Sequence, residues 1–376
     1  MIPREVFAQT LLQFFAPVRR LLDDPAVTEV VINGPGEVYA ERGGRLQRTD
    51  CQFASQEALL AALRNAAQFV GRRVDESEPI LQGRLPDGSR LQAVLPPVAP
   101  EGPFVAIRRF SGHTLTLGRL VESDALSRAA ARFIEGCVVA RLNVLVAGGA
   151  GSGKTSLLGA LAGCVPPDER IVVIEDCREL RTPRGHVVGL EARAPDPGGG
   201  NAVGIGDLFR AALRLRPDRI FIGEIRGGEA LDIVQAMTSG HGGCMATLHA
   251  TLPRDTLARL ETMCLMSGTG LPLGAIREQI GSGVDLLIQL SRQRDGSRKV
   301  THVTEVAGFD STTGKYELND LFVREYRQSA GAEPTASALV YTGRAVACQK
   351  QLHQHGVNVA PEGAPSAEGH GEGARE

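Results

Sequence analysis

The chain has 376 residues, of which 43% are hydrophobic and 22% charged, and its formal net charge is −2. This length supports two domains with substantial cores, and this composition excludes a disordered or fibrous chain. The near-neutral charge gives no long-range attraction to nucleic acid, although it leaves room for a local basic channel. The seven cysteines include no C-x-x-C pair, which favours reduced thiols over a disulfide framework. The amphipathic start is broken by charges, and no uncharged apolar run approaches the roughly twenty residues of a membrane span.

The first part of the chain, residues 1–110, is predicted to form a small mixed α+β domain. Alternating apolar residues and turn signals predict strands, and apolar residues at helical spacing predict one helix. The expected elements are strands over 27–33, 37–42 and 104–110, a helix over 56–73 and a hairpin over 84–96 that turns at Asp87-Gly88. A polar connection follows, and we take residues 111–122 as a linker.

Continuous apolar runs then alternate with helical segments, a pattern typical of a parallel sheet buried on both faces. These runs cover 143–148, 170–176, 219–224 and 243–250. Residues 284–306 predict two further strands around an Asp295-Gly296 turn. We therefore expect an α/β domain over 123–345. Residues 346–376 are expected to be a largely disordered tail, because the segment from Pro361 onward has little to bury.

The segment "GGAGSGKT" fits the pattern G-x-x-x-x-G-K-[ST], with an apolar strand before it and a helical segment after it. A chance match in a chain of this length is on the order of one per cent at average composition. Lys154 is expected to reach the β- and γ-phosphates, and the Thr155 hydroxyl to ligate Mg²⁺. The predicted nucleotide-binding residues are Gly148, Gly149, Ala150, Gly151, Ser152, Gly153, Lys154, Thr155 and Ser156.

Carboxylates follow two of the predicted parallel strands, at the sheet edge where α/β folds bind ligands. Glu175 and Asp176 come after the strand "RIVVI", and they can hold Mg²⁺ through water or orient the attacking water. The alternative is a solvated, acidic helix start. Glu224 ends the strand "RIFIG", which lacks the metal-binding aspartate usual at this point. Glu224 is expected to polarise water or assist magnesium, and the alternative is a structural ion pair with Arg226.

The stretch "TSGHGGCMATLHA" places His241, Cys244 and His249 close together in the sequence. A metal site is disfavoured, because alternate strand residues face opposite sides and no fourth ligand is near. Core histidines are a second possibility. The favoured interpretation is that His249 senses phosphate at the strand end while His241, on the glycine-rich turn, approaches a neighbouring subunit.

These motifs in this order resemble the Walker A, Asp box, Walker B and His box of the secretion ATPase superfamily, which includes type II and type IV secretion and type IV pilus motors. The segments that carry the resemblance are "GGAGSGKT", "IEDCREL", "LRLRPDRIFIGEIRGGEALDIVQAMTSGHGGCMATLHA" and "RDTLARLETM". Others resemble the CpaF branch, the tight-adherence (Tad) pilus ATPase: "GRRVDESEPILQGRLPDGSRLQAVLPP", "LPLGAIREQIGSGVDLLIQLSRQRDGSRKVTHVTEV" and "LVYTG". The likeness spans residues 16 to 345.

The resemblance implies a homohexameric ATPase whose PAS-like N-terminal domain closes over ATP and Mg²⁺ held on a RecA-like P-loop domain. It assigns catalysis to Glu224, with Glu175 in the Asp box, His241 and His249 in the His box, and Lys154 in the P-loop. Family members also use N-terminal arginines against the γ-phosphate. These map to Arg90 and Arg108, with Arg226 supporting the site and surface strand arginines as the alternative.

The resemblance further implies a cytoplasmic motor, peripheral at the inner face of the inner membrane, that works on pilus platform proteins and drives pilus assembly, with or without retraction. The nearest alternative is the same engine in type IV secretion or conjugation. A nucleic-acid translocase and a slow nucleotide switch belong to other classes, and the first is disfavoured by the mild acidity of the chain. The family often carries a longer N-terminal extension, and its members often have small polar residues at Cys177 and Cys244. We therefore hypothesise that these thiols are sensitive to oxidation.

Overall fold

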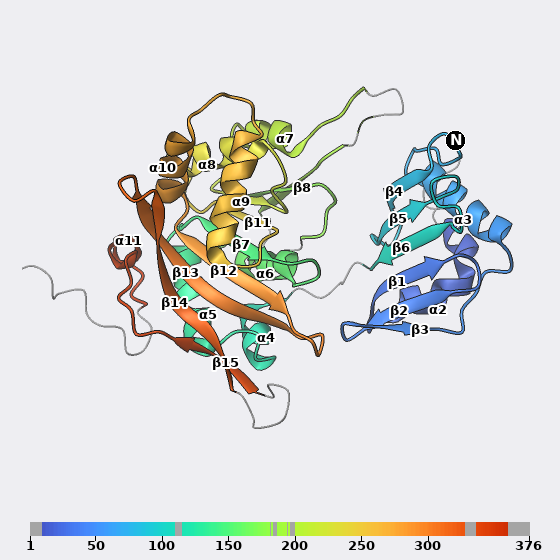
Figure 1. The fold of residues 1–376 in the computed structure, drawn as a ribbon, viewed down its shortest axis with the longest axis horizontal. Coiled ribbons are helices and arrows are strands. Elements are labelled where there is room, and N and C mark those ends of the chain that lie inside the picture. Colours follow the sequence, from blue (N-terminus) through green and yellow to red (C-terminus); the bar gives the residue numbers. More distant parts are fainter. Residues whose placement is uncertain are drawn as a thin grey trace, which may run out of the picture. The chain divides into compact units, whose positions relative to one another are not determined.

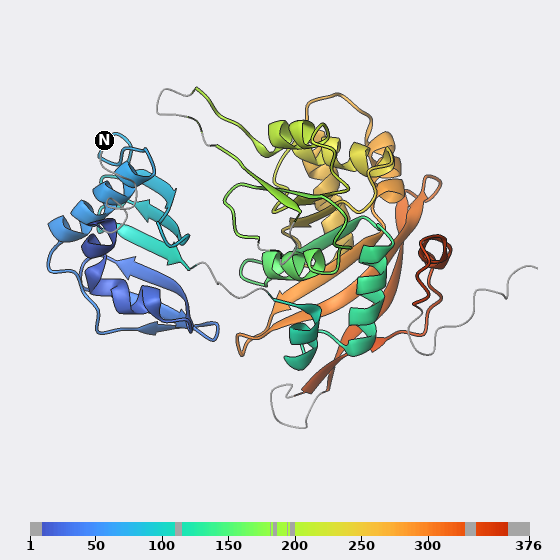
Figure 2. The ribbon, with the colours of Figure 1, turned by 180° about the vertical axis from the view of Figure 1, so that it is seen from behind.

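The computed structural model divides the described chain into two compact units (Figures 1 and 2), each treated by itself below. The residues described are 10–109, 115–180, 182, 186–193, 195, 200–327 and 336–359. The first unit holds the described residues up to 109 together with 294–297, and the second holds the remainder. Within the described residues, no helix is both long enough and apolar enough to cross a bilayer.

The first unit is a six-stranded antiparallel sheet in the order β3-β2-β1-β6-β5-β4, covered by helices. Its longest helix begins at Ser55, whose hydroxyl accepts a hydrogen bond from Ala58 N at 3.2 Å. The predicted strands, helix and hairpin are confirmed, whereas β3 was not predicted because all four of its residues are exposed. The elements are η1 (Ala16–Val18), α2 (Arg19–Asp23), β1 (Val27–Asn33), β2 (Val38–Arg42), β3 (Arg45–Arg48), α3 (Gln56–Phe69), β4 (Ile80–Arg84), β5 (Arg90–Val94) and β6 (Phe104–Arg108).

The second unit is built on a nine-stranded mixed sheet in the order β15-β14-β13-β12-β7-β11-β10-β8-β9. The strands from β12 to β9 in this order run parallel, and β13, β14 and β15 add antiparallel strands at one edge. The strands are β7 (Val144–Gly148), β8 (Ile171–Glu175), β9 (Val187–Glu191), β10 (Arg219–Ile222), β11 (Met245–Leu248), β12 (Leu286–Arg292), β13 (Arg298–Asp310), β14 (Lys315–Arg327) and β15 (Ala336–Tyr341).

Helices cover both faces of this sheet, as the continuous apolar strands predicted. Val144 and Val146 face the core that contains α4, α5 and α6, while Leu145 between them faces the core that contains α7 to α10. The predicted α/β class is therefore confirmed. The helices are α4 (Leu117–Glu122), α5 (Arg128–Val139), α6 (Lys154–Ala162), α7 (Ile205–Ala212), α8 (Glu229–Thr238), α9 (Pro253–Leu265), α10 (Leu273–Gly283) and α11 (Gln349–Gln354).

Two segments expected to be irregular contain helices. The linker segment 111–122 includes α4, which buries Leu117 and Leu120 in the core of the second unit. The tail segment 346–376 includes α11, and Val346 and Leu352 enter the same core. Each of these helices is only six residues long, so its few apolar residues give no periodic signal. Residues 110–114, most of the glycine-rich loop at 194–199 and the tail from 360 onward lie outside the described residues.

Candidate nucleotide-binding site

The phosphate-binding loop joins the fully buried strand β7 to helix α6. Gly153 caps α6 with φ +95°, a left-handed conformation that favours glycine. This turn aims the first amides of α6 and the helix dipole at one point, an arrangement suited to phosphate. Thr155 is half-buried in the first turn of the helix, and Ser156 next to it is exposed.

Lys154 lies over the loop that it follows. Its Nζ donates hydrogen bonds to the carbonyl oxygens of Gly148 and Gly149, both at 3.0 Å, and the residue is only 8% exposed. The same Nζ lies 3.4 Å from Nδ1 of His249, at the end of β11. The ammonium group is therefore held at the centre of the loop, where a phosphate would meet it.

A chain of paired side chains continues from His249 across the carboxyl ends of the strands. His249 Nε2 lies 2.6 Å from Oε1 of Glu224, and Arg226 donates from Nε to the other oxygen, Oε2, at 2.7 Å. Arg226 also pairs with Asp176 at 2.9 Å. The structure thus brings together five of the predicted site residues, and the two oxygens of Glu224 face His249 and Arg226.

His249 is placed to act as a neutral imidazole. Burial lowers its pKa, the Lys154 ammonium lowers it further, and Glu224 opposes both. A neutral ring with its proton on Nε2 can donate to Glu224 and accept from Lys154 at Nδ1. His249 therefore links the lysine of the phosphate loop to the carboxylate of the neighbouring strand.

Glu175 is held differently from Glu224. It is 3% exposed, and its Oε1 accepts hydrogen bonds from the backbone N–H groups of Glu179 at 2.9 Å and Leu180 at 2.7 Å. Burial raises the pKa of this carboxyl, although the two backbone bonds act against that rise. A Cβ at Gly223 would lie 2.9 Å from Glu175 Cγ. A side chain at position 223 would therefore collide with Glu175, which accounts for the glycine that follows β10.

The structure does not bring His241 to this site. His241 is exposed on the turn that precedes β11, whereas His249 follows the same strand at its other end. Among the described residues there is no group of three His, Cys, Asp or Glu side chains that could hold a metal ion. Cys244 is buried, and burial raises the pKa of its thiol to about 12. The oxidation hypothesis is thus wrong for Cys244, because an inaccessible neutral thiol is unreactive; Cys177 is partly exposed.

Arg90 and Arg108 lie in the first unit as direct cross-strand partners on β5 and β6. Arg84 on β4 is opposite Arg90, and Glu29 on β1 is opposite Arg108. Residues at directly paired positions project from the same face of a sheet. The register set by the Asp87-Gly88 turn is what places Arg84 opposite Arg90.

Comparison with known proteins agrees with this geometry. The Type II/IV secretion system protein family matches residues 12–357. A Mycobacterium tuberculosis protein whose name assigns it provisionally to conjugal transfer is 37% identical over 301 residues, which cover 78% of this chain and 85% of the relative. The type IV secretion system protein VirB11 of Brucella suis is 34% identical, with 77% and 88% covered.

A crystal structure of the pilus retraction motor PilT with bound ADP aligns with a TM-score of 0.53. The alignment covers 78% of this chain and 79% of that one, and its 18% identity supports the fold alone. The relatives named above are conjugation and type IV secretion proteins, so they do not support the narrower assignment to the tight-adherence branch. The family match spans nearly the whole chain. The chain belongs to the type II/IV secretion ATPase family and is an ATP hydrolase.

Proposed function

We propose that this protein is the traffic ATPase of a type IV secretion or conjugation system. The observation that carries the proposal is the identity of 34–37% to proteins named for those systems, over more than three quarters of the chain. The paired Lys154, His249 and Glu224 side chains support an ATP-driven engine at the carboxyl ends of the strands. We further propose that it works as a homohexamer on the cytoplasmic side of the inner membrane, against membrane proteins of the secretion apparatus.

In the proposed reaction, the phosphate loop and Lys154 bind the β- and γ-phosphates. Glu224 orients a water molecule for in-line attack on the γ-phosphate. Its Oε2 accepts a hydrogen bond from Arg226, so Oε1, on the side of His249, is the oxygen proposed to meet the water. His249 is the group best placed to report the change, because it contacts both Lys154 and Glu224. Arg90 and Arg108 are proposed to stabilise the charge that develops in the transition state.

Magnesium fits this group of residues. The Thr155 hydroxyl lies in the first turn of α6, directly after Lys154, and oxygen donors are the ligands that Mg²⁺ prefers. Asp176 and Glu175 lie at the neighbouring strand end and can hold the water molecules of the ion. Of the two, Asp176 is the more available, because Oε1 of Glu175 already accepts two backbone hydrogen bonds. A bound ion would neutralise the charge that develops on the phosphates.

A pilus motor is the second candidate, because the segments around residues 71–97 and 271–306 resemble the tight-adherence ATPase. The two candidates share the same chemistry and differ in the cargo that is moved. A nucleic-acid translocase would show ATP hydrolysis strongly stimulated by DNA or RNA, and steeply salt-dependent binding to them.

The test replaces the native gene with a Lys154→Ala allele and measures two outputs of the host cell: type IV transfer of DNA or protein, and pili on the surface. We expect transfer to be lost, because an ammonium that binds both phosphates is removed. Lys315→Ala, which removes an exposed lysine on β14, is the matched control. Loss of pili with transfer intact would favour the pilus motor, and no loss of either would contradict both.

A further inference from the structure

A β-hairpin lies directly beside the phosphate-binding loop. β12 pairs with β7 as far as Leu290 opposite Gly148, the last residue of β7 before the loop. The approach is close, because a Cβ on Gly148 would lie 2.7 Å from the Leu290 carbonyl oxygen. β12 then continues for two more residues and turns back as β13, with Arg292 and Arg298 as the directly paired residues next to the turn.

Both arginines lie close to the glycines of the loop, and Arg298 bonds to one of them. Arg298 donates a hydrogen bond from Nε to the carbonyl oxygen of Gly151 at 2.9 Å. Its Cδ would lie 3.2 Å from a Cβ on Gly153, and Nη1 of Arg292 would lie 3.3 Å from a Cβ on Gly151. Two guanidinium groups from a distant part of the sequence therefore lie against the backbone that would wrap around phosphate.

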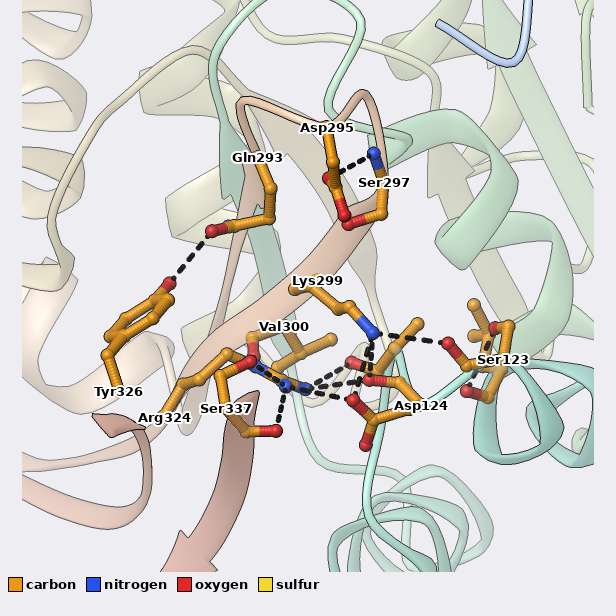
Figure 3. Close-up of polar contacts among 12 residues, drawn as sticks. Ser123, Asp124, Gln293, Asp295, Ser297, Lys299, Val300, Arg324, Tyr326 and Ser337 are labelled. Carbon is orange, nitrogen blue, oxygen red and sulfur yellow. Dashed lines mark hydrogen bonds and ion pairs between the residues drawn. The ribbon is translucent and has the colours of Figure 1, made fainter. Parts of the chain in front are cut away.

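The base of this hairpin is fixed within the second unit (Figure 3). Lys299, next to Arg298, donates to Oδ2 of Asp124 at 2.9 Å and also to the Asp124 carbonyl at 2.9 Å. Arg324, with a fully buried side chain, donates from Nε to the Val300 carbonyl at 2.8 Å. Because these bonds hold the start of β13, the two arginines meet the loop from a defined position.

We propose that Arg292 and Arg298 are part of the nucleotide site: Arg298 positions the phosphate loop through Gly151, and Arg292 supplies a cation to the phosphates of a bound nucleotide. Like charges at directly paired positions of two strands repel each other. A polyanion bound in the adjacent loop would offset part of that repulsion, so the pair favours the nucleotide-bound state. The inference rests on the nucleotide site of the proposed function and not on the cargo.

The test uses the purified full-length protein with Arg292→Gln, Arg298→Gln and the double variant. ATP hydrolysis is measured in magnesium, and ADP affinity by calorimetry. For each single variant we expect KM and the ADP dissociation constant to rise about three- to tenfold, as for an exposed charge-assisted contact. We expect kcat to change by less than about twofold, because the contact exists in both ground and transition states. The loss should shrink at high salt.

Arg294→Gln is the matched control, since it removes the same charge from the same hairpin, between the two arginines in the sequence. An equal effect of Arg294→Gln would overturn the contact, as would unchanged affinity in the double variant. If Arg298→Gln fails to fold, the ADP affinity of Arg292→Gln tests the proposal, because Arg292 is exposed and its replacement should leave the fold intact. Lys154→Ala tests the nucleotide site independently of the two arginines. Unaltered ADP affinity in that variant would refute the nucleotide site itself.

Discussion

The two ends of the parallel strands both collect charged side chains, but these side chains have different partners. At the carboxyl ends, Glu224, His249 and Arg226 pair with one another and remain partly exposed. At the amino ends, Arg219 is fully buried, donates to the Val138 carbonyl at 2.8 Å and pairs with Glu169. The same residue types therefore form an open cluster at one edge and a closed one at the other.

At the amino ends of the strands, buried side chains form hydrogen bonds with backbone groups. Asn143, which precedes β7, donates to the Gly283 carbonyl at 2.8 Å and accepts from Cys244 N at 3.0 Å, so it ties three segments together. A buried side chain that bonds to the backbone of several segments is held in place by all of them, whereas an exposed side chain that bonds to another side chain can rotate away. The difference indicates that the amino edge fixes the sheet and that the carboxyl edge can rearrange around a ligand.

The comparison predicts its largest effect on stability at the amino edge. Arg219→Gln should lower the free energy of unfolding by about 3–5 kcal/mol, because the half-buried Glu169 carboxylate and the Val138 carbonyl lose their partner. Denaturant titration measures this, with the exposed Arg214→Gln as control. A loss below about 1 kcal/mol, the range of exposed pairs, would show that the buried cluster is not structural.

At the carboxyl edge, the expected effect is on turnover. His249→Gln should lower kcat roughly 100-fold, the low end for a group that aids proton transfer, while the melting temperature stays near that of the wild type. The control is His241→Gln, which changes a histidine at the other end of β11. It should change kcat by less than about twofold. Equal losses in the two variants would remove the distinction between the histidines and would favour an intersubunit role for His241.

A smaller effect is expected in the pH dependence of stability. Burial raises the pKa of Asp285, which accepts a hydrogen bond from Asn143 N, from 3.8 to about 6. Because the folded protein holds the proton of Asp285 more tightly than the unfolded chain, Asp285 stabilises the fold fully below pH 4. This contribution is lost as the pH rises to 6. Asp285→Asn does not titrate, so from pH 4 to 7 it should gain about 2 kcal/mol relative to the wild type. Unfolding at several pH values measures this, with exposed Asp168→Asn as control; parallel curves would contradict it.

Local patterns allowed much of the fold to be predicted. Alternation in 27–33 and 37–42, the Asp87-Gly88 turn and the buried runs around the phosphate loop each depend on residues close in sequence. Segments whose structure depends on distant partners were missed. Leu352 of α11 enters a core that also contains α5, more than two hundred residues earlier in the chain, so no local periodic pattern predicts this helix.

The sequence predicted which residues form the site, but it did not predict the contacts between them. The motifs indicated Lys154, Glu224 and His249, yet the sequence could not show that His249 bridges the other two, because three separate strands meet there. Arg292 and Arg298 were passed over for the same reason, since the register of β12 beside β7 decides their place. The sequence placed His249 at the strand end and His241 on the preceding turn, and the two histidines lie at opposite ends of β11.

The central claim is that Glu224, held by His249 and Arg226, prepares the water that attacks ATP. The most direct measurement compares ATP hydrolysis and ATP affinity of purified Glu224→Gln with those of the wild type. The account predicts affinity within about threefold and turnover reduced by roughly 100- to 1000-fold, because the amide keeps the shape but cannot accept a proton. Turnover close to that of the wild type, with ATP bound as tightly, would contradict it.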